Sequence, residues 1–218
     1  MDRVQILKRL ETRLPSCSKF EEMVIKHLQE NYFAFVYQAM YIQLGYKERN
    51  NKFTNQEFKE LLSNNNFVDF INEVYRTHLS WEGVKEVKNR LQQVEDFDDY
   101  VSSLQAFESC DPITYKNGKE IQKNAFSFGT KILHFYNPDE NPILDSFVRT
   151  NLKIKGEMDK DLCIEFREGA REFAQLHHDY FVYFNESENI RQELAKRHMT
   201  SDFPIMEIFD MALYEPEK

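Results

Sequence analysis

The sequence has few of the residues that make tight turns and few that bind metals. Glycine and proline each occur six times in 218 residues. Because strand-rich folds need many tight turns, this scarcity favours helices. The three cysteines, Cys17, Cys110 and Cys163, lie far apart and form neither a CxxC motif nor a cluster with histidine. We therefore expect reduced thiols, no disulfide framework, no zinc or iron–sulfur site and no other cofactor.

Long apolar runs are also missing. The N-terminal segment MDRVQILKRLETRL is charged throughout and lacks the apolar centre of a signal peptide. No apolar run approaches the ~20 residues that a membrane-spanning helix needs. What the chain does contain, 41% hydrophobic and 14% aromatic residues, is typical of a globular protein. We expect a soluble, cytoplasmic protein that does not bind membranes.

Apolar residues recur at helical spacing from one end of the chain to the other. They predict, among others, a long helix over residues 18–45 and another over residues 162–184. Ser18–Glu21 and Thr54–Glu57 have the pattern of capping boxes, in which a hydroxyl and a carboxylate bond the free amides of a helix start. The sequence shows no internal repeat and no β-hairpin signal.

These patterns predict an all-α fold, a single compact domain of about ten helices. A possible seam near residues 110–117 would divide it into two helical lobes, 1–110 and 117–218, with a cleft between them. The helix over residues 18–45 is apolar around much of its circumference, so we expect it to lie at the centre of the bundle.

The charge is unevenly distributed along the chain. A net charge of −9 argues against binding polyanions over the whole surface. Residues 116–155, however, hold seven basic and four acidic side chains, which leaves the rest of the chain at −12. A basic segment in an acidic protein is a plausible footprint for a phosphate backbone. The alternative is that its lysines are ordinary solvated helix faces.

Two short motifs stand within this basic segment. Asn141-Pro142 predicts a helix start and places Asp145 in the first turn, where a carboxylate is favoured. Gly129-Thr130-Lys131 allows two interpretations. In the first, residues 119–136 form one continuous helix and Gly129 permits close packing. In the second, the chain turns at residues 127–129, exposed amides there bind a phosphate, and Lys131 starts the next helix facing Asp145.

The two motifs together resemble the centre of the helix-hairpin-helix DNA glycosylases, the superfamily of 8-oxoguanine DNA glycosylase and endonuclease III. The resemblance covers about residues 126–150. In that superfamily a hairpin binds a DNA phosphate, its second helix carries a lysine, and an aspartate follows at the next helix start. The resemblance implies that Lys131 is the Schiff-base nucleophile at the sugar C1′ and that Asp145 stabilises the oxocarbenium-like transition state. Ser127 stands where the family hairpin has its first glycine.

The expected function is therefore excision of a damaged or modified base from duplex DNA, with the target nucleotide flipped into a cleft. The residues expected to contact nucleic acid are Lys119, Lys123, Ser127, Gly129, Thr130, Arg149, Lys153 and Lys155. A metal site at His177-His178 is disfavoured because the chain has no Glu-x-x-His pair. The alternative function is a non-enzymatic helical interaction module, for instance a component of a bacterial or phage defence system.

Overall fold

The computed structural model describes residues 1–64, 66–77, 79–108, 113–114, 120–121 and 124–214. The predicted all-α fold is confirmed: the protein is a single compact domain, 69% helical, with thirteen α-helices in its described part. Besides the helices, β1 (Ile113–Thr114) and β2 (Glu120–Ile121) form a two-stranded antiparallel ladder, for which the sequence showed no hairpin signal. No described helix is long and apolar enough to cross a bilayer.

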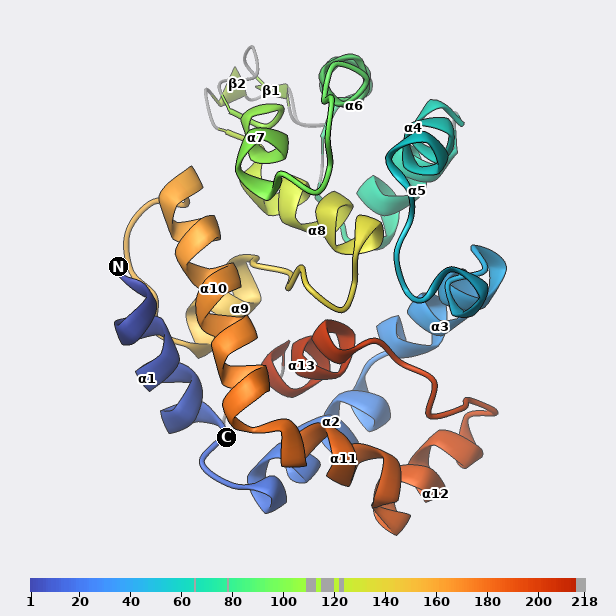
Figure 1. Ribbon diagram of the computed structural model, residues 1–218, viewed down its shortest axis with the longest axis vertical. Helices are drawn as coiled ribbons and strands as arrows, with labels where there is room; N and C mark the ends of the chain where they lie inside the picture. Colours follow the sequence, from blue (N-terminus) through green and yellow to red (C-terminus); the bar gives the residue numbers. More distant parts are fainter. Residues whose placement is uncertain (65, 78, 109–112, 115–119, 122–123, 215–218) are drawn as a thin grey trace.

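The helices follow one another with short connections. In chain order they are α1 (Arg3–Arg13), α2 (Cys17–Glu30), α3 (Phe33–Gln43), the 3-10 helix η1 (Lys47–Arg49), α4 (Asn55–Ser63), α5 (Phe67–Val74), α6 (Trp81–Leu91), α7 (Tyr100–Gln105), α8 (Phe126–Tyr136), α9 (Ser146–Asn151), α10 (Lys160–Leu176), α11 (His178–Glu186), α12 (Glu188–Lys196) and α13 (Ile205–Tyr214). Figure 1 shows α4 to α8 in its upper half and α1, α2 and α11 to α13 below them, with α9 at mid-height and α10 running down the left side from the level of α8 to α11.

This arrangement differs from the predicted lobes 1–110 and 117–218. Helix α1 packs against α10, and α2 packs against α13, so the two ends of the chain build the lower half together (Figure 1). The predicted seam at residues 110–117 lies mostly outside the described residues. Because the lower half contains both ends of the chain, the described contacts do not divide the molecule into two sequential lobes.

Capping side chains mark most helix starts, and two breaks in the backbone divide helices that the sequence predicted to be continuous. Thr54 and Glu57 form the predicted capping box of α4, but α2 is capped by Ser16, two residues earlier than predicted, through the Lys19 amide. The helix predicted over residues 18–45 is two helices, because Asn31 has an extended backbone. His177 likewise separates α10 from α11, so the helix predicted over residues 162–184 is also two helices.

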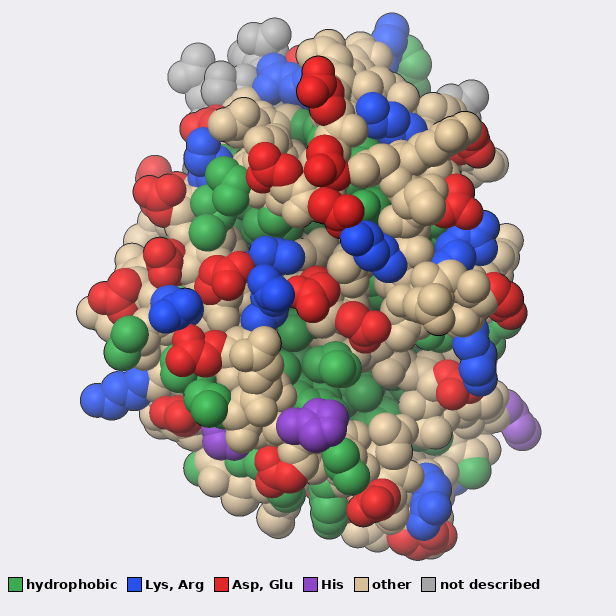
Figure 2. Space-filling view, viewed as in Figure 1, with side chains coloured by type: hydrophobic (Ala, Val, Ile, Leu, Met, Phe, Trp, Pro, Cys, Tyr) green, Lys and Arg blue, Asp and Glu red, His purple; other side chains and the backbone are tan. Residues whose placement is uncertain are grey.

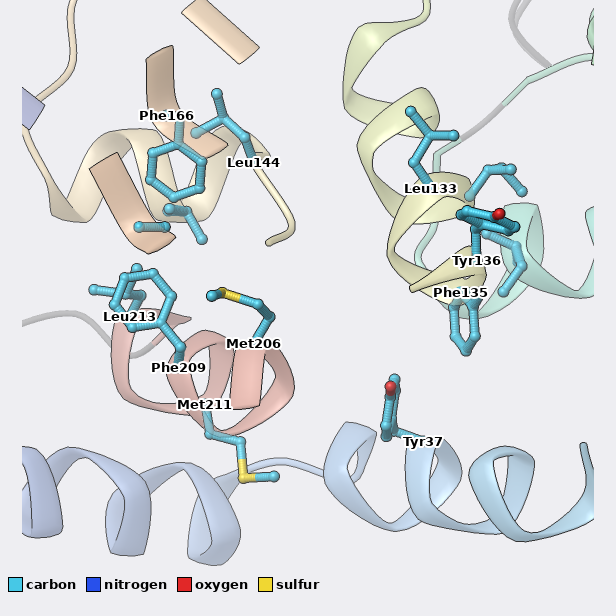
Figure 3. Close-up of a cluster of buried hydrophobic side chains, with 14 of the residues drawn as sticks. Tyr37, Leu133, Phe135, Tyr136, Leu144, Phe166, Met206, Phe209, Met211 and Leu213 are labelled. Atoms are coloured by element: carbon cyan, nitrogen blue, oxygen red, sulfur yellow. The ribbon is translucent and has the colours of Figure 1, made fainter. Parts of the chain in front are cut away.

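The centre of the molecule is α8 rather than the segment predicted to lie there. Ten of the eleven residues of α8 are buried, with Ser127 the exception. Figure 3 shows Leu133, Phe135 and Tyr136 of this helix in the core, which also contains side chains from α3, α10 and α13. Helix α3, by contrast, leaves Ile42 66% exposed. The polar side chains of Thr130, Lys131 and His134 on α8 are therefore placed inside the protein.

Candidate active site

Lys131 and Asp145 form a buried ion pair between α8 and the start of α9. The Lys131 Nζ lies 3.3 Å from the Asp145 Oδ2. The two residues are 2% and 9% exposed. The Lys131 Nζ is also 3.3 Å from the Ser127 Oγ and 5.6 Å from the centre of the Tyr75 ring. The fold thus brings together the two residues that the sequence assigns to catalysis.

Helix α8 places the lysine without the turn that one interpretation required. Residues 127–129 belong to the first turn of α8, and the Gly129 amide donates to the Ala125 carbonyl at 2.8 Å. The predicted turn is therefore wrong, and so is a helix continuous from residue 119, because α8 begins at Phe126. The packing role of Gly129 is confirmed: a Cβ there would lie 2.7 Å from two ring atoms of Phe107.

Helix α9 holds the aspartate by a different geometry from the one predicted. The helix does not begin at Pro142 but at Ser146, and Asp145 is its N-cap. The Asp145 Oδ1 accepts hydrogen bonds from the amides of Phe147 and Val148, at 2.9 and 3.0 Å. The other oxygen, Oδ2, remains for Lys131. One carboxylate therefore both caps a helix and pairs with the amine.

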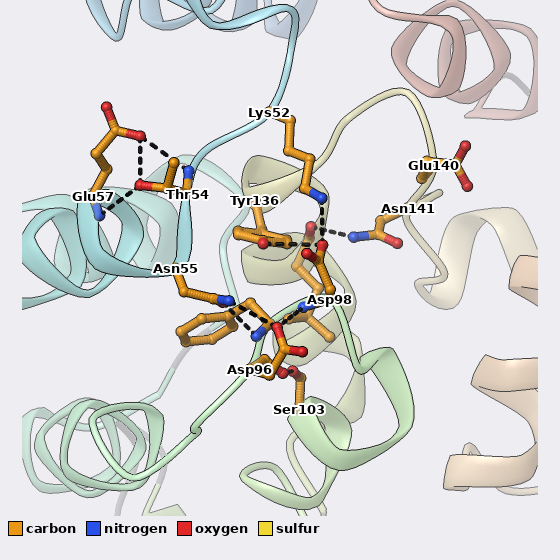
Figure 4. Close-up of polar contacts among 12 residues, drawn as sticks. Lys52, Thr54, Asn55, Glu57, Asp96, Asp98, Ser103, Tyr136, Glu140 and Asn141 are labelled. Atoms are coloured by element: carbon orange, nitrogen blue, oxygen red, sulfur yellow. Dashed lines mark hydrogen bonds and ion pairs between the residues drawn. The ribbon is translucent and has the colours of Figure 1, made fainter.

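The loop before Asp145 is held by side chains instead of by helical hydrogen bonds. The Thr130 hydroxyl lies 3.1 Å from the Leu144 carbonyl oxygen and 3.2 Å from its amide. The Asn141 side chain donates to the Leu133 carbonyl and accepts from Arg167 Nε, both at 2.8 Å. These contacts tie the loop to α8 and α10, and Figure 4 shows Asn141 beside the end of α8. They explain why the predicted helix start fails.

Acidic side chains from α13 surround the ion pair. Burial raises the pKa of the Asp210 carboxyl well above its usual range, and the nearby Glu207 and Asp145 raise it further, while Lys131 lowers it. Burial also raises the pKa of the Tyr75 hydroxyl, with contributions from Glu207, Asp210 and Asp145. Asp210 is therefore close enough to feel Lys131, Asp145 and Glu207, and the balance of burial and these charges favours its protonated form relative to an ordinary aspartic acid.

A buried histidine connects these acids to the loop. The His134 Nδ1 lies 2.7 Å from the Asn141 carbonyl oxygen, which can only accept, so this nitrogen carries a proton. In the neutral ring the Nε2 then accepts the Tyr37 hydroxyl at 3.0 Å. The Glu207 carboxylate is 3.5 Å from the same Nε2. Among the described residues no group of histidine, cysteine and acidic side chains has the geometry of a metal site.

Sequence reasoning missed Tyr75, Glu207 and Asp210 as neighbours of the ion pair. A signal for the two acids was present, because they interrupt an otherwise apolar helix, IMEIFDMALY, at a spacing of three residues. Residues three apart on a helix lie near the same face, so this spacing predicts that both acids lie on the same side of α13. No comparable signal marks Tyr75, which follows the last residue of α5.

The residues expected to contact phosphate do not assemble into one surface. Thr130 is 1% exposed and Gly129 is buried, so both are packing residues and not phosphate ligands. Ser127 faces Lys131. Arg149 donates to the Gly156 carbonyl, and Lys153 and Lys155 are exposed. Lys119 and Lys123 lie outside the described residues. On the face drawn in Figure 2, basic and acidic side chains are interspersed.

Comparisons with known proteins give no family assignment. No protein-family model, curated protein or solved structure matches the chain. A function for this chain must therefore follow from the chemistry of its own residues, and above all from the ion pair between α8 and α9.

Proposed function

We propose that the protein is a DNA-binding enzyme that excises a damaged or modified base, with Lys131 as the nucleophile and Asp145 as the stabilising aspartate. One observation carries the proposal: an amine and a carboxylate on two different elements meet 3.3 Å apart in the core. Buried ion pairs are weak contributors to stability, because the cost of removing charges from water offsets their attraction. Buried ionisable groups with perturbed surroundings are instead frequent in active sites.

The chemistry needs a neutral amine. The Lys131 ammonium loses a proton, for which the Asp145 carboxylate at 3.3 Å is the nearest acceptor. The amine then attacks the sugar C1′, forming an N–C1′ bond as the bond from C1′ to the base breaks. The electron pair of that bond leaves with the base, which takes up a proton. The nitrogen now bound to C1′ loses a proton, and its lone pair forms the C=N bond as C1′–O4′ breaks. This gives the protonated Schiff base, and O4′ takes up the proton that the nitrogen released.

Asp145 acts on the charge that develops at C1′. Asp145 passes the proton taken from Lys131 to the departing base, so its carboxylate is ionised again and stabilises the positive charge that builds on the sugar. The Phe147 and Val148 amides hold the Asp145 Oδ1, so the carboxylate is oriented before the substrate arrives. Ser127 and Tyr75, which contact the Lys131 amine, are partly exposed, so we place the entry of the target nucleotide beside them. Flipping of the nucleotide out of the duplex is required to reach this depth.

Borohydride trapping tests the proposal. Wild-type protein incubated with lesion-bearing duplex and borohydride is expected to give a covalent protein–DNA adduct, and Lys131→Gln is expected to give none. The matched control is Lys52→Gln. The Lys52 Nζ lies 2.5 Å from the Asp98 Oδ1 and 5.7 Å from the Tyr136 ring centre, so it has the same kinds of neighbours at an exposed position (Figure 4).

The control variant is expected to form as much adduct as wild type. Circular dichroism checks that each variant is folded. An adduct that persists in Lys131→Gln, or wild-type protein that forms none with any lesion tested, would overturn the proposal.

A non-enzymatic interaction module is the second candidate, and exposed apolar side chains favour it. Tyr32 is 71% exposed, and Phe35 and Ile42 of α3 are 43% and 66% exposed. Apolar side chains that remain exposed on one helix are a feature of protein-binding surfaces. In that case the ion pair is purely structural, and trapping with borohydride gives no adduct while a partner protein binds at α3.

A further inference from the structure

A basic hollow lies on the surface between α1 and the end of α9. It has a volume of about 430 Å³. Lys8, Arg9, Arg13 and Lys153 line it, together with the polar side chains of Gln5 and Thr12, and no acidic residue of the described chain does so. In a protein of net charge −9, a hollow lined by four basic residues is a local departure from the average surface. Its potential favours an anion.

Helix α1 presents one side of the hollow as a continuous face. Gln5, Lys8, Arg9 and Thr12 stand at positions i, i+3, i+4 and i+7, which share one side of a helix. The opposite side of α1 packs against α10. The basic face of α1 is therefore directed away from the core, and Lys8 is exposed.

The end of α9 forms the other side and is fixed to α1. The Arg9 Nη1 donates to the Leu152 and Lys153 carbonyl oxygens, at 2.7 and 2.8 Å. Lys153 has a left-handed backbone, with φ of 55°, and its side chain is exposed. Two segments more than 140 residues apart in the sequence thus hold Lys8 and Lys153 on one hollow in a defined geometry.

The same short helix connects the hollow to the proposed active site. Asp145 caps the start of α9, and Lys153 follows its end. Six helical residues at about 1.5 Å each separate the two by on the order of 10 Å along the helix. Successive phosphates of a duplex strand are spaced by about 3.4 Å along its axis, so this length corresponds to roughly three nucleotides.

We propose that the hollow binds a backbone phosphate of the nucleic acid, roughly three nucleotides from the one that reaches Lys131. This inference rests on the proposed function. Lys8 and Lys153 supply charge, Arg9 supplies charge at a fixed position, and Thr12 and Gln5 supply neutral hydrogen-bond donors. Inorganic phosphate would meet the same groups, and the test separates the two sources.

The test is the salt dependence of duplex binding, measured by fluorescence anisotropy with wild type and two double variants. Lys8→Gln/Lys153→Gln removes two charges from the hollow. Lys47→Gln/Lys196→Gln removes two exposed charges elsewhere, each of them paired with an acid. Because each neutralised phosphate contributes about 0.9 to the slope of log K against log salt, loss of the one phosphate contact is expected to reduce that slope by about 0.9. At ~0.1 M salt this is a loss of affinity on the order of ten-fold.

The control variant is expected to keep the wild-type slope. If the hollow variant keeps it too, while wild type binds duplex and forms the borohydride adduct, the hollow inference fails and the proposed function stands. If wild type binds duplex through the hollow but forms no adduct, the proposed chemistry fails and the phosphate site stands. A thermal-shift measurement with inorganic phosphate separates the two sources of phosphate. If phosphate stabilises wild type but not the hollow variant, and the hollow variant still binds duplex like wild type, the hollow binds a free anion. That result would overturn the inference.

Discussion

The buried Lys131–Asp145 pair predicts that removing both charges costs less stability than removing the lysine alone. Lys131→Met removes the amine and keeps an apolar stem of similar length. It leaves Asp145 and Asp210, whose carboxyl groups interact, without the Lys131 ammonium. Asp145→Asn keeps the helix cap, because asparagine caps a helix start about as well as aspartate. It also leaves Glu207 and Asp210 near the ammonium.

The expected losses in free energy of unfolding differ because only the single variants leave a buried charge without its partner. Breaking a buried ion pair by removing one partner costs about 3–5 kcal/mol, so Lys131→Met is expected to lose that much free energy of unfolding. For a chain of this length the loss corresponds to a fall in Tm of about 10 °C. Asp145→Asn is expected to lose less, about 1–3 kcal/mol, because the remaining acids compensate the ammonium. The double variant, which buries no unpaired partner, is expected to lie within about 2 kcal/mol of wild type.

Urea unfolding followed by circular dichroism at neutral pH measures all four proteins, and the double-mutant cycle gives the coupling energy directly. The borohydride adduct is measured in parallel. The double variant is expected to be folded and to form no adduct, which separates catalysis from folding. Single losses that simply add in the double variant, or a Lys131→Met protein as stable as wild type, would refute the claim that the two charges interact in the core.

Two further variants test the surroundings of the pair. Because the folded-state pKa of Asp210 is raised, the folded protein holds this proton more tightly than the unfolded chain, so the contribution of Asp210 to stability should fall as pH rises above about 4 through the raised pKa. Asp210→Asn should lose less stability over that range in urea unfolding at a series of pH values, and parallel curves would contradict this. Gly129→Ala should lower the Tm, because a Cβ placed 2.7 Å from the Phe107 ring overpacks the core by about 1–3 kcal/mol, against a gain in helix propensity of about 1 kcal/mol. A raised Tm would show that Phe107 yields.

The sequence predicts what short-range chemistry decides. Apolar periodicity and the scarcity of glycine and proline were sufficient for the all-α class, and the Thr54 capping box was correct because all its partners lie within three residues. The helix start at Pro142 failed because Thr130, fourteen residues from Leu144, bonds the backbone that a helix would have used. Local propensity was overruled by a tertiary contact.

The candidate site was also predicted only in part from the sequence. The resemblance to glycosylases selected Lys131 and Asp145, and the fold brings them into contact, although the hairpin that the resemblance implies is not formed at residues 127–129. The hollow could not be predicted, because Lys8 and Lys153 meet only through the packing of α1 against the end of α9. In the sequence Lys8 and Lys153 belong to different segments, so a count of charges along the chain does not bring them together.

The position of the ion pair is hard to explain by stability alone. Helix α8 already buries ten of its eleven residues, so the core does not need the Lys131 amine to hold this helix in place. Apolar side chains of the same volume would fill the space without the cost of removing charges from water. The core instead contains the amine, Asp145 and Asp210 close together: burial, Glu207 and Asp145 raise the pKa of Asp210, and Lys131 lowers it. The proposed Schiff-base chemistry would account for this cost in stability, because it needs an amine and a carboxylate held together out of water.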